Sequence, residues 1–222
     1  MPDTRLFSAR ERKDLRLAVV QTLRMWGDER YDLFLAHAKP GHLTEEWFRW
    51  FVGAWNVART IKRGRLGLVR QYLDRDFRKE LSEGGGAEAV DAAAVHIQKK
   101  GWSSQKRKNG QGSLPISLVS KVGFFLCPNR LVPLDRYAVR GLNDLRRIGG
   151  ASRLKGRSYR EYLEAFNEQY AKIEHQLAAA LNESSVIALA NKLRCPANAL
   201  STIAMRRKLF DDYPMHSGDY LR

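Results

Sequence analysis

The sequence has 222 residues and a formal net charge of +15, from 39 lysines and arginines against 24 acidic residues. Its hydrophobic content of 44% predicts a packed globular interior rather than a disordered chain. The positive excess is spread along the whole chain, which favours a polyanionic partner, with nucleic acid first and an anionic membrane surface second. A basic protein without such a partner is the remaining alternative.

The cysteines and histidines argue against a metal site. Cys127 and Cys195 lie far apart, and the histidines are scattered without the spacing of zinc ligands, iron–sulfur ligands or a zinc deaminase. The N-terminus is charged and has no apolar core, so no signal peptide is expected. No apolar run approaches the roughly 18 residues of a membrane-spanning helix. We therefore expect a cytosolic, reduced protein with no metal and no cofactor.

Apolar residues at helical spacing, interrupted by glycine and proline, predict helices throughout and no convincing strand. The expected helices cover residues 9–26, 31–38, 45–63, 66–82, 87–100, 136–147, 159–181, 184–193 and 199–210, with a short apolar helix before Cys127. The fold class is expected to be all-α, with two helical lobes and a groove between them. One lobe is expected to cover about 40–147, and residues 1–39 and 148–222 are expected to form the other.

The helix expected at 45–63 is rich in aromatic residues. The run Thr44-Glu45-Glu46-Trp47 predicts a capping box at its start. Aromatic residues at helical spacing usually form core, and we expect this of Phe48, Phe51 and Trp55. Trp47 and Trp50 do not fit one narrow face, so one of them is a candidate to line a groove and stack on a base.

A glycine-containing segment at 99–112 concentrates positive charge without an acidic residue. Its cations are Lys99, Lys100, Lys106, Arg107 and Lys108. A solvated loop is the simpler interpretation. Because the whole chain is basic, we favour a loop that binds the phosphates of a nucleic acid.

The stretch from Val119 to Arg140 carries the most specific pattern. Pro133 restricts the backbone just before Asp135, and Asp135 stands at the expected N-cap of a helix that is rich in arginines. A helix cap needs no further function. A rigidly held carboxylate in a cationic groove also suits glycosidic bond cleavage, because it stabilises positive charge on the sugar or activates water.

Over roughly residues 113–147 the chain resembles the helix-hairpin-helix (HhH-GPD) superfamily of base-excision DNA glycosylases. Pro133-Leu134-Asp135 matches the Pro-apolar-Asp element that carries the catalytic aspartate, and Arg140 matches the arginine that usually follows it. Lys121 falls near the Schiff-base lysine of bifunctional members. The resemblance implies that Asp135 is catalytic and that double-stranded DNA is the substrate.

The hairpin of that family usually reads Leu-Pro-Gly-x-Gly, whereas residues 112–120 contain no Gly-x-Gly. We expect Ser117 or Ser120 to offer a hydroxyl to phosphate instead. Lys121 is a desolvated nucleophile, a phosphate contact or an exposed lysine at a helix start. We favour the contact, which predicts a monofunctional enzyme.

The sequence thus predicts a monomeric DNA glycosylase of the cytoplasm, associated with the nucleoid and not with a membrane. Arg136 and Arg140 are expected to contact DNA, and Phe124 joins Trp47 and Trp50 as a candidate to stack on the flipped base. The substrate is expected to be a damaged base, or a modified viral base in a defence role. The alternatives are a non-catalytic DNA-binding protein on the same scaffold and an RNA- or membrane-associated helical module.

Overall fold

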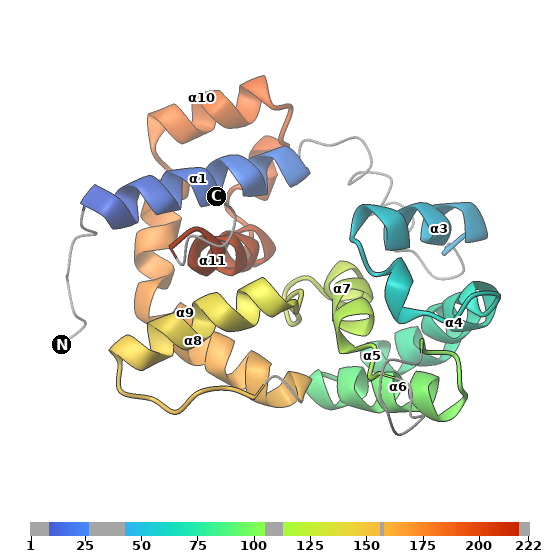
Figure 1. Cartoon of the computed structure of the whole chain (residues 1–222). Helices are drawn as coiled ribbons and strands as arrows, with labels where there is room; N and C mark the ends of the chain where they lie inside the picture. Colours follow the sequence, from blue (N-terminus) through green and yellow to red (C-terminus); the bar gives the residue numbers. More distant parts are fainter. Residues whose placement is uncertain (1–8, 27–42, 105–112, 156–157, 218–222) are drawn as a thin grey trace. The chain divides into compact units, whose positions relative to one another are not determined.

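The computed structural model of the protein describes residues 9–26, 43–104, 113–155 and 158–217 (Figure 1). These residues form helices and contain no strand, although an isolated antiparallel bridge pairs Ile61 with Ser103. The all-α prediction is therefore confirmed. The helix expected at 31–38 lies outside the described residues.

The chain divides into two compact units. The first unit contains residues 1–33, 135–156 and 161–222, and the second contains 34–134 and 157–160. The boundary therefore falls at Asp135, and the helix that follows it groups with the two ends of the chain. The sequence instead predicts that this helix groups with the segment before it. The groove between two lobes stays a prediction.

The second unit is built from short consecutive helices. They are α3 (Glu45–Ala54), η1 (Ala58–Thr60), α4 (Leu66–Tyr72), η2 (Leu73–Phe77), α5 (Arg78–Ser82), α6 (Ala87–Lys99) and α7 (Ile116–Leu126). Of the predicted capping box of α3, the N-cap half is confirmed, because the Thr44 hydroxyl accepts a hydrogen bond from the Trp47 N–H at 3.2 Å. The reciprocal half is not formed, since the third residue after Thr44 is Trp47 and not a glutamate or glutamine. The segment η2 is a single π-helical turn, which joins α4 to α5 without a break.

Helix α3 ends at Ala54 and not at residue 63 as predicted. Asn56 adopts a left-handed conformation with φ of 52°, which ends the helical run before η1 begins. Asparagine tolerates this conformation better than most residues because its short side chain bonds locally to the backbone. The prediction overran because the apolar spacing continues past Asn56.

Helix α7 is almost completely buried in the second unit. A Cβ at Gly123 would lie 2.9 Å from Leu131 Cδ1 and 3.4 Å from Phe77, so this glycine permits close packing. Helix α6 packs on α7, and its Ala93 and Ala94 have no exposed surface. Close packing on several sides is what takes the polar residues Ser120 and Lys121 into the interior.

The first unit contains α1 (Ala9–Trp26), α8 (Arg136–Ile148), α9 (Tyr159–Leu181), α10 (Ser184–Lys192), η3 (Ala197–Ala199) and α11 (Ile203–Ser217). Helix α11 packs against both α1 and α8 (Figure 1). Its Phe210 meets Phe166 of α9 edge to face, with ring centroids 4.8 Å apart. Helix α11 is thus the central element of this unit.

Helix α11 covers residues 203–217, whereas the predicted last helix covered 199–210. Asp211, Asp212 and Pro214 resemble the start of a polar tail, and a proline in a helix interior removes a backbone donor. All three residues are buried, however, and Lys208 forms ion pairs with both aspartates. Burial against α1 and α8 therefore maintains the helix through Pro214.

Candidate functional site

Asp135 is the N-cap of α8, as predicted. Its carboxylate oxygen Oδ1 accepts hydrogen bonds from the backbone N–H groups of Tyr137 and Ala138, at 2.8 and 2.9 Å. The backbone of Asp135 is extended, with φ of −140°, which is the usual cap geometry. The side chain is half-buried. The cap therefore fixes the orientation of this carboxylate at the positive end of a helix.

The segment that leads into Asp135 is fixed within the second unit. The Tyr159 hydroxyl accepts a hydrogen bond from the Val132 N–H at 2.9 Å and donates one to the Val132 carbonyl at 2.7 Å. The Leu134 N–H donates to the Ser120 hydroxyl at 3.0 Å. Because both anchors are buried, the backbone just before Asp135 has little freedom to move.

The predicted phosphate contact at Ser120 is corrected. Ser120 has no exposed surface, and its hydroxyl also donates to the Ser117 carbonyl at 3.2 Å. A buried hydroxyl that makes both of its hydrogen bonds inside the protein is not accessible to a phosphate. Its observed role is to anchor Leu134. Ser117 is half-buried in the first turn of α7, and its part in phosphate binding stays a prediction.

The predicted surface contact at Lys121 is also corrected. Its side chain is 6% exposed, and Nζ donates a hydrogen bond to the Trp55 carbonyl at 3.2 Å. The same nitrogen lies 5.5 Å from the centre of the Trp55 ring. The face of an indole ring attracts an ammonium group. The Lys121 side chain thus packs inside the second unit against Trp55.

Two of the three aromatic residues expected in a base pocket belong to the core instead. Phe124 has no exposed surface and packs edge to face on Phe125, with centroids 5.0 Å apart. Trp47 is 7% exposed and stacks on Phe51 at 5.2 Å. Neither ring is accessible to a base in this conformation. Trp50 is half-exposed, and its role as a stacking platform stays a prediction.

The predicted phosphate-binding loop is described only at its ends. Lys99 and Lys100 are exposed at the end of α6, whereas Lys106, Arg107 and Lys108 lie outside the described residues. The N–H of Ser113 donates to the Ser104 carbonyl at 3.1 Å, so the two ends of the segment are joined.

A basic turn next to this loop was not identified from sequence patterns. The Lys62 N–H donates to the Trp102 carbonyl at 2.8 Å, which places this turn beside the base of the predicted loop. Its exposed cations are Arg59, Lys62, Arg63 and Arg65. The density of cations in this stretch is a signal that the sequence contains. The turn was missed because the helix was predicted to continue to residue 63.

The predicted DNA contacts on α8 are accessible. Arg136 and Arg140 are both exposed, and the Arg136 guanidinium lies 4.6 Å from the centre of the Tyr137 ring. Arg140 lines a cavity of about 250 Å³ on the surface of the first unit. Both arginines therefore remain candidates to bind an anion.

A buried ionic cluster on α11 also escapes prediction from sequence. Lys208 Nζ donates to Asp211 at 2.9 Å and also to Asp212, whose other oxygen accepts from the Thr22 hydroxyl at 2.7 Å. Tyr162 donates to Asp211 at 3.4 Å. The i, i+3 and i+4 spacing on one helix is the available signal.

The charges in this cluster do not balance, because one ammonium faces two carboxylates. Burial raises the pKa of Asp211 to about 6, and the negative charges of Asp212 and Asp135 add to this effect against the opposing influence of Lys208. Burial by itself would lower the pKa of Lys208, but the two aspartates raise it above its usual value. The Asp135 carboxylate is therefore electrostatically linked to the interior of the first unit.

None of the described helices combines the length and the apolar character needed to cross a membrane. In the same part of the chain, no three His, Cys, Asp or Glu side chains are grouped so as to hold a metal ion. Comparison with protein-family models, curated proteins and solved structures finds no match to this chain. The interpretation of the site therefore rests on its own residues.

Proposed function

We propose that this protein is a DNA glycosylase that hydrolyses the N-glycosidic bond of a flipped-out base and leaves an abasic site. The observation that supports the proposal best is the Asp135 carboxylate, held by two backbone donors directly after Pro133-Leu134. The match to the Pro-apolar-Asp element supplies the family analogy. The net charge of +15 supports a polyanionic substrate.

In the proposed reaction the bond between C1′ of the sugar and the base nitrogen breaks, and its electron pair leaves with the base. Positive charge develops on the sugar, and the fixed carboxylate of Asp135 stabilises it. A water molecule then adds its oxygen to C1′, and its proton balances the charge of the departed base. The cap prepares Asp135 for this role because the carboxylate needs no reorientation during the reaction.

We propose that the enzyme is monofunctional. A lyase reaction needs a neutral amine to attack C1′, whereas Lys121 Nζ donates to the Trp55 carbonyl and lies over an indole ring. Both contacts hold Nζ inside the second unit, away from an attack on a sugar. Borohydride treatment during turnover should therefore give no covalent protein–DNA adduct, and an adduct that disappears in Lys121→Met would overturn this assignment.

The proposal is tested with duplex oligonucleotides that each carry one altered base. The panel includes deaminated, oxidised and alkylated bases and the bulky modified bases of viral genomes, and alkali then cleaves any abasic site. Wild-type protein should release at least one base, and Asp135→Asn should abolish release while binding the duplex with similar affinity. Release by the variant at the wild-type rate would refute the catalytic role.

A non-catalytic DNA-binding protein is the second candidate, because the cap by itself explains Asp135. It predicts salt-dependent duplex binding and no base release from any member of the panel. A cytoplasmic, nucleoid-associated location would accompany either function.

A further inference from the structure

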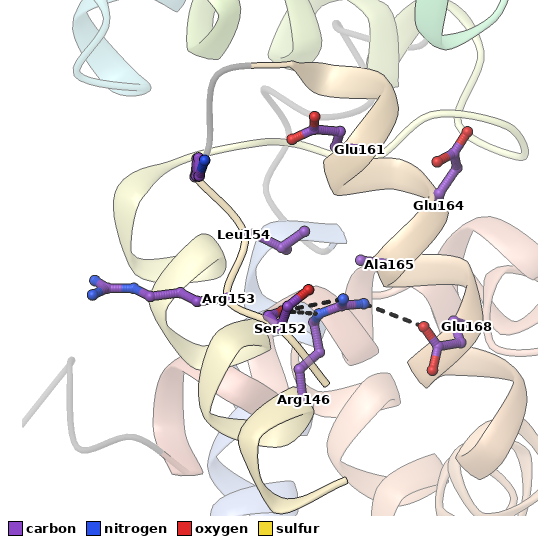
Figure 2. Close-up of a pocket in the computed structure, with 9 residues that line it drawn as sticks. Arg146, Ser152, Arg153, Leu154, Glu161, Glu164, Ala165 and Glu168 are labelled. Carbon is purple, nitrogen blue, oxygen red and sulfur yellow. Dashed lines mark hydrogen bonds and ion pairs between the residues drawn. The ribbon is translucent and has the colours of Figure 1, made fainter. Parts of the chain in front are cut away.

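The loop that follows α8 folds back onto the helix and is fixed there by side chains. The Asn143 amide accepts a hydrogen bond from the Leu154 N–H at 2.7 Å and donates one to the Leu154 carbonyl at 3.3 Å. The Arg146 guanidinium donates to the Ser152 carbonyl from Nε and Nη2, at 3.3 and 3.2 Å (Figure 2). The position of Arg153, between these two anchored residues, is therefore defined by the fold.

Three arginines surround the cavity of about 250 Å³ between this loop and α8. Arg140 and Arg147 are seven residues apart, so they lie about two turns apart on the same helix face. Arg153 completes the lining from the loop. We call Arg140, Arg147 and Arg153 the arginine pocket.

The arginine pocket carries uncompensated positive charge. Its one acidic lining residue, Asp144, lies 3.8 Å from Arg147, which leaves three guanidinium groups against one carboxylate, a net charge of +2. Within the described part of the chain, the guanidinium groups of Arg140 and Arg153 have neither an ion-pair nor a hydrogen-bond partner. Both side chains are exposed, so they are available to a ligand.

An adjacent cavity of about 480 Å³ shows the opposite arrangement. It is lined by three carboxylates, those of Glu161, Glu164 and Glu168, and by three cations, Arg146, Lys155 and Arg153, the last of which lines both cavities. Arg146 forms an ion pair with Glu168 at 3.2 Å. Figure 2 shows that Arg153 extends away from Glu164 and Glu168. The charges that line the adjacent cavity therefore sum to zero, whereas those that line the arginine pocket sum to +2.

We propose that the arginine pocket binds a backbone phosphate of double-stranded DNA. The planar fork of a guanidinium group matches two phosphate oxygens, and converging arginines favour phosphate over a smaller anion. Arg140 follows Asp135 by five residues, or roughly 8 Å along the helix axis. The pocket thus contacts a phosphate a few nucleotides from the reacting one.

The identification of the ligand as double-stranded DNA rests on the proposed function. The pocket also offers a reason why the chain dispenses with the Gly-x-Gly hairpin of the family. In the pocket, guanidinium groups of α8 and of the loop that follows it serve as phosphate donors in place of backbone N–H groups.

The test measures duplex binding by fluorescence anisotropy over a range of salt concentrations, in an Asp135→Asn background so that no chemistry intervenes. The test variant is Arg140→Ala with Arg153→Ala. Its matched control is Arg12→Ala with Arg16→Ala, which removes the same charge from exposed positions of α1 in the same unit. Circular dichroism checks that both variants are folded.

The pocket variant should bind at least roughly tenfold more weakly, because its charge-assisted hydrogen bonds to the phosphate cannot form. The slope of log affinity against log salt should fall by about 1 for each phosphate that the variant no longer neutralises. If the pocket variant and the control show the same decrease in affinity and slope, the pocket proposal is wrong. If the alanine variant does not fold, Arg140→Lys with Arg153→Lys replaces it and should keep the salt slope while weakening binding.

A second arm uses inorganic phosphate as a competitor. If phosphate binding but not duplex binding depends on the two arginines, the pocket takes a free anion and the assignment to DNA fails. Base release is measured separately in the Asp135 wild-type background. Duplex binding that depends on the pocket, without release of any base, would refute the glycosylase function and leave the pocket assignment standing.

Discussion

Gly141 of α8 lies directly against Pro214 of α11. A Cβ at position 141 would stand 2.6 Å from the Pro214 carbonyl carbon, and both residues are buried. A glycine on one helix thus meets the proline turn of the other. This approach brings the N-terminal part of α8, which begins after Asp135, close to the buried carboxylates of α11.

Gly141→Ala should destabilise the first unit by about 1–3 kcal/mol, because the new methyl group meets rigid backbone that cannot move aside easily. Chemical denaturation of the variant measures this decrease in stability. Gly149→Ala is the matched control, since its nearest neighbour is 3.5 Å away and its φ is −83°. Equal stability of the two variants would contradict the close packing.

Asp135→Ala should lower the unfolding free energy by about 1 kcal/mol because it removes the cap, whereas Asp135→Asn should change it by only a few tenths. Asparagine retains an oxygen that accepts from the Tyr137 and Ala138 N–H groups. Comparison of the two variants separates the capping role of Asp135 from its catalytic role. Only the alanine variant should be destabilised, whereas neither variant should release a base. A large destabilisation by Asp135→Asn would show that the negative charge itself supports the fold.

Tyr159→Phe should lower the unfolding free energy by about 2 kcal/mol or more, since two buried backbone groups of Val132 are left without their partner. Tyr170→Phe is the control, because its hydroxyl donates to the partly exposed Glu174 at 3.0 Å. Thermal unfolding compares the two variants. If the first variant were as stable as the second, the segment before Asp135 would not depend on this anchor.

Asp211 should make stability fall as pH rises between about 4 and 6. Its pKa is about 6 in the folded protein against an ordinary value of 3.8, so the folded state holds the proton more tightly. The stability linked to this proton is fully present below the ordinary pKa and lost above the raised one. The difference in unfolding free energy between wild type and Asp211→Asn should therefore change by about 3 kcal/mol across this range.

Unfolding free energies measured at pH 4, 5, 6 and 7 test whether the stability linked to Asp211 falls as pH rises. The lowered pKa of Glu168, which hydrogen bonds to Lys172 and Arg146 cause, acts in the opposite direction, and subtraction of the Asp211→Asn curve removes its contribution. A difference that stays constant with pH would contradict the buried ionic cluster. Asp135→Asn should also lower the pKa of Asp211, because it removes one of the negative charges that raise it.

Local sequence patterns predicted the features that depend on neighbouring residues. Helical spacing indicated the all-α fold, and Thr44 and Asp135 each cap the helix that they were expected to cap. A cap is encoded by a polar side chain two or three residues before the N–H groups that it satisfies. Such a pattern can be recognised without knowledge of the rest of the chain.

Burial could not be predicted in the same way. Lys121 and Ser120 lie next to each other in an apolar run, and their types alone favoured the surface. The close packing that Gly123 and the α6 alanines permit took both inside, where Trp55 and Leu134 became their partners. Those partners are 66 and 14 residues away in sequence.

The sequence by itself determined the helical character, the positive charge and the cap at Asp135, because each depends on composition or on contacts within one turn. Tertiary structure decided which cations stay accessible: Lys121 was buried, whereas Arg140 and Arg153 were brought to one pocket by a loop that Asn143 fixes to α8. It also decided that α11 continues through Pro214. Desolvation and packing involve residues far apart in the chain, so only the folded molecule sets them.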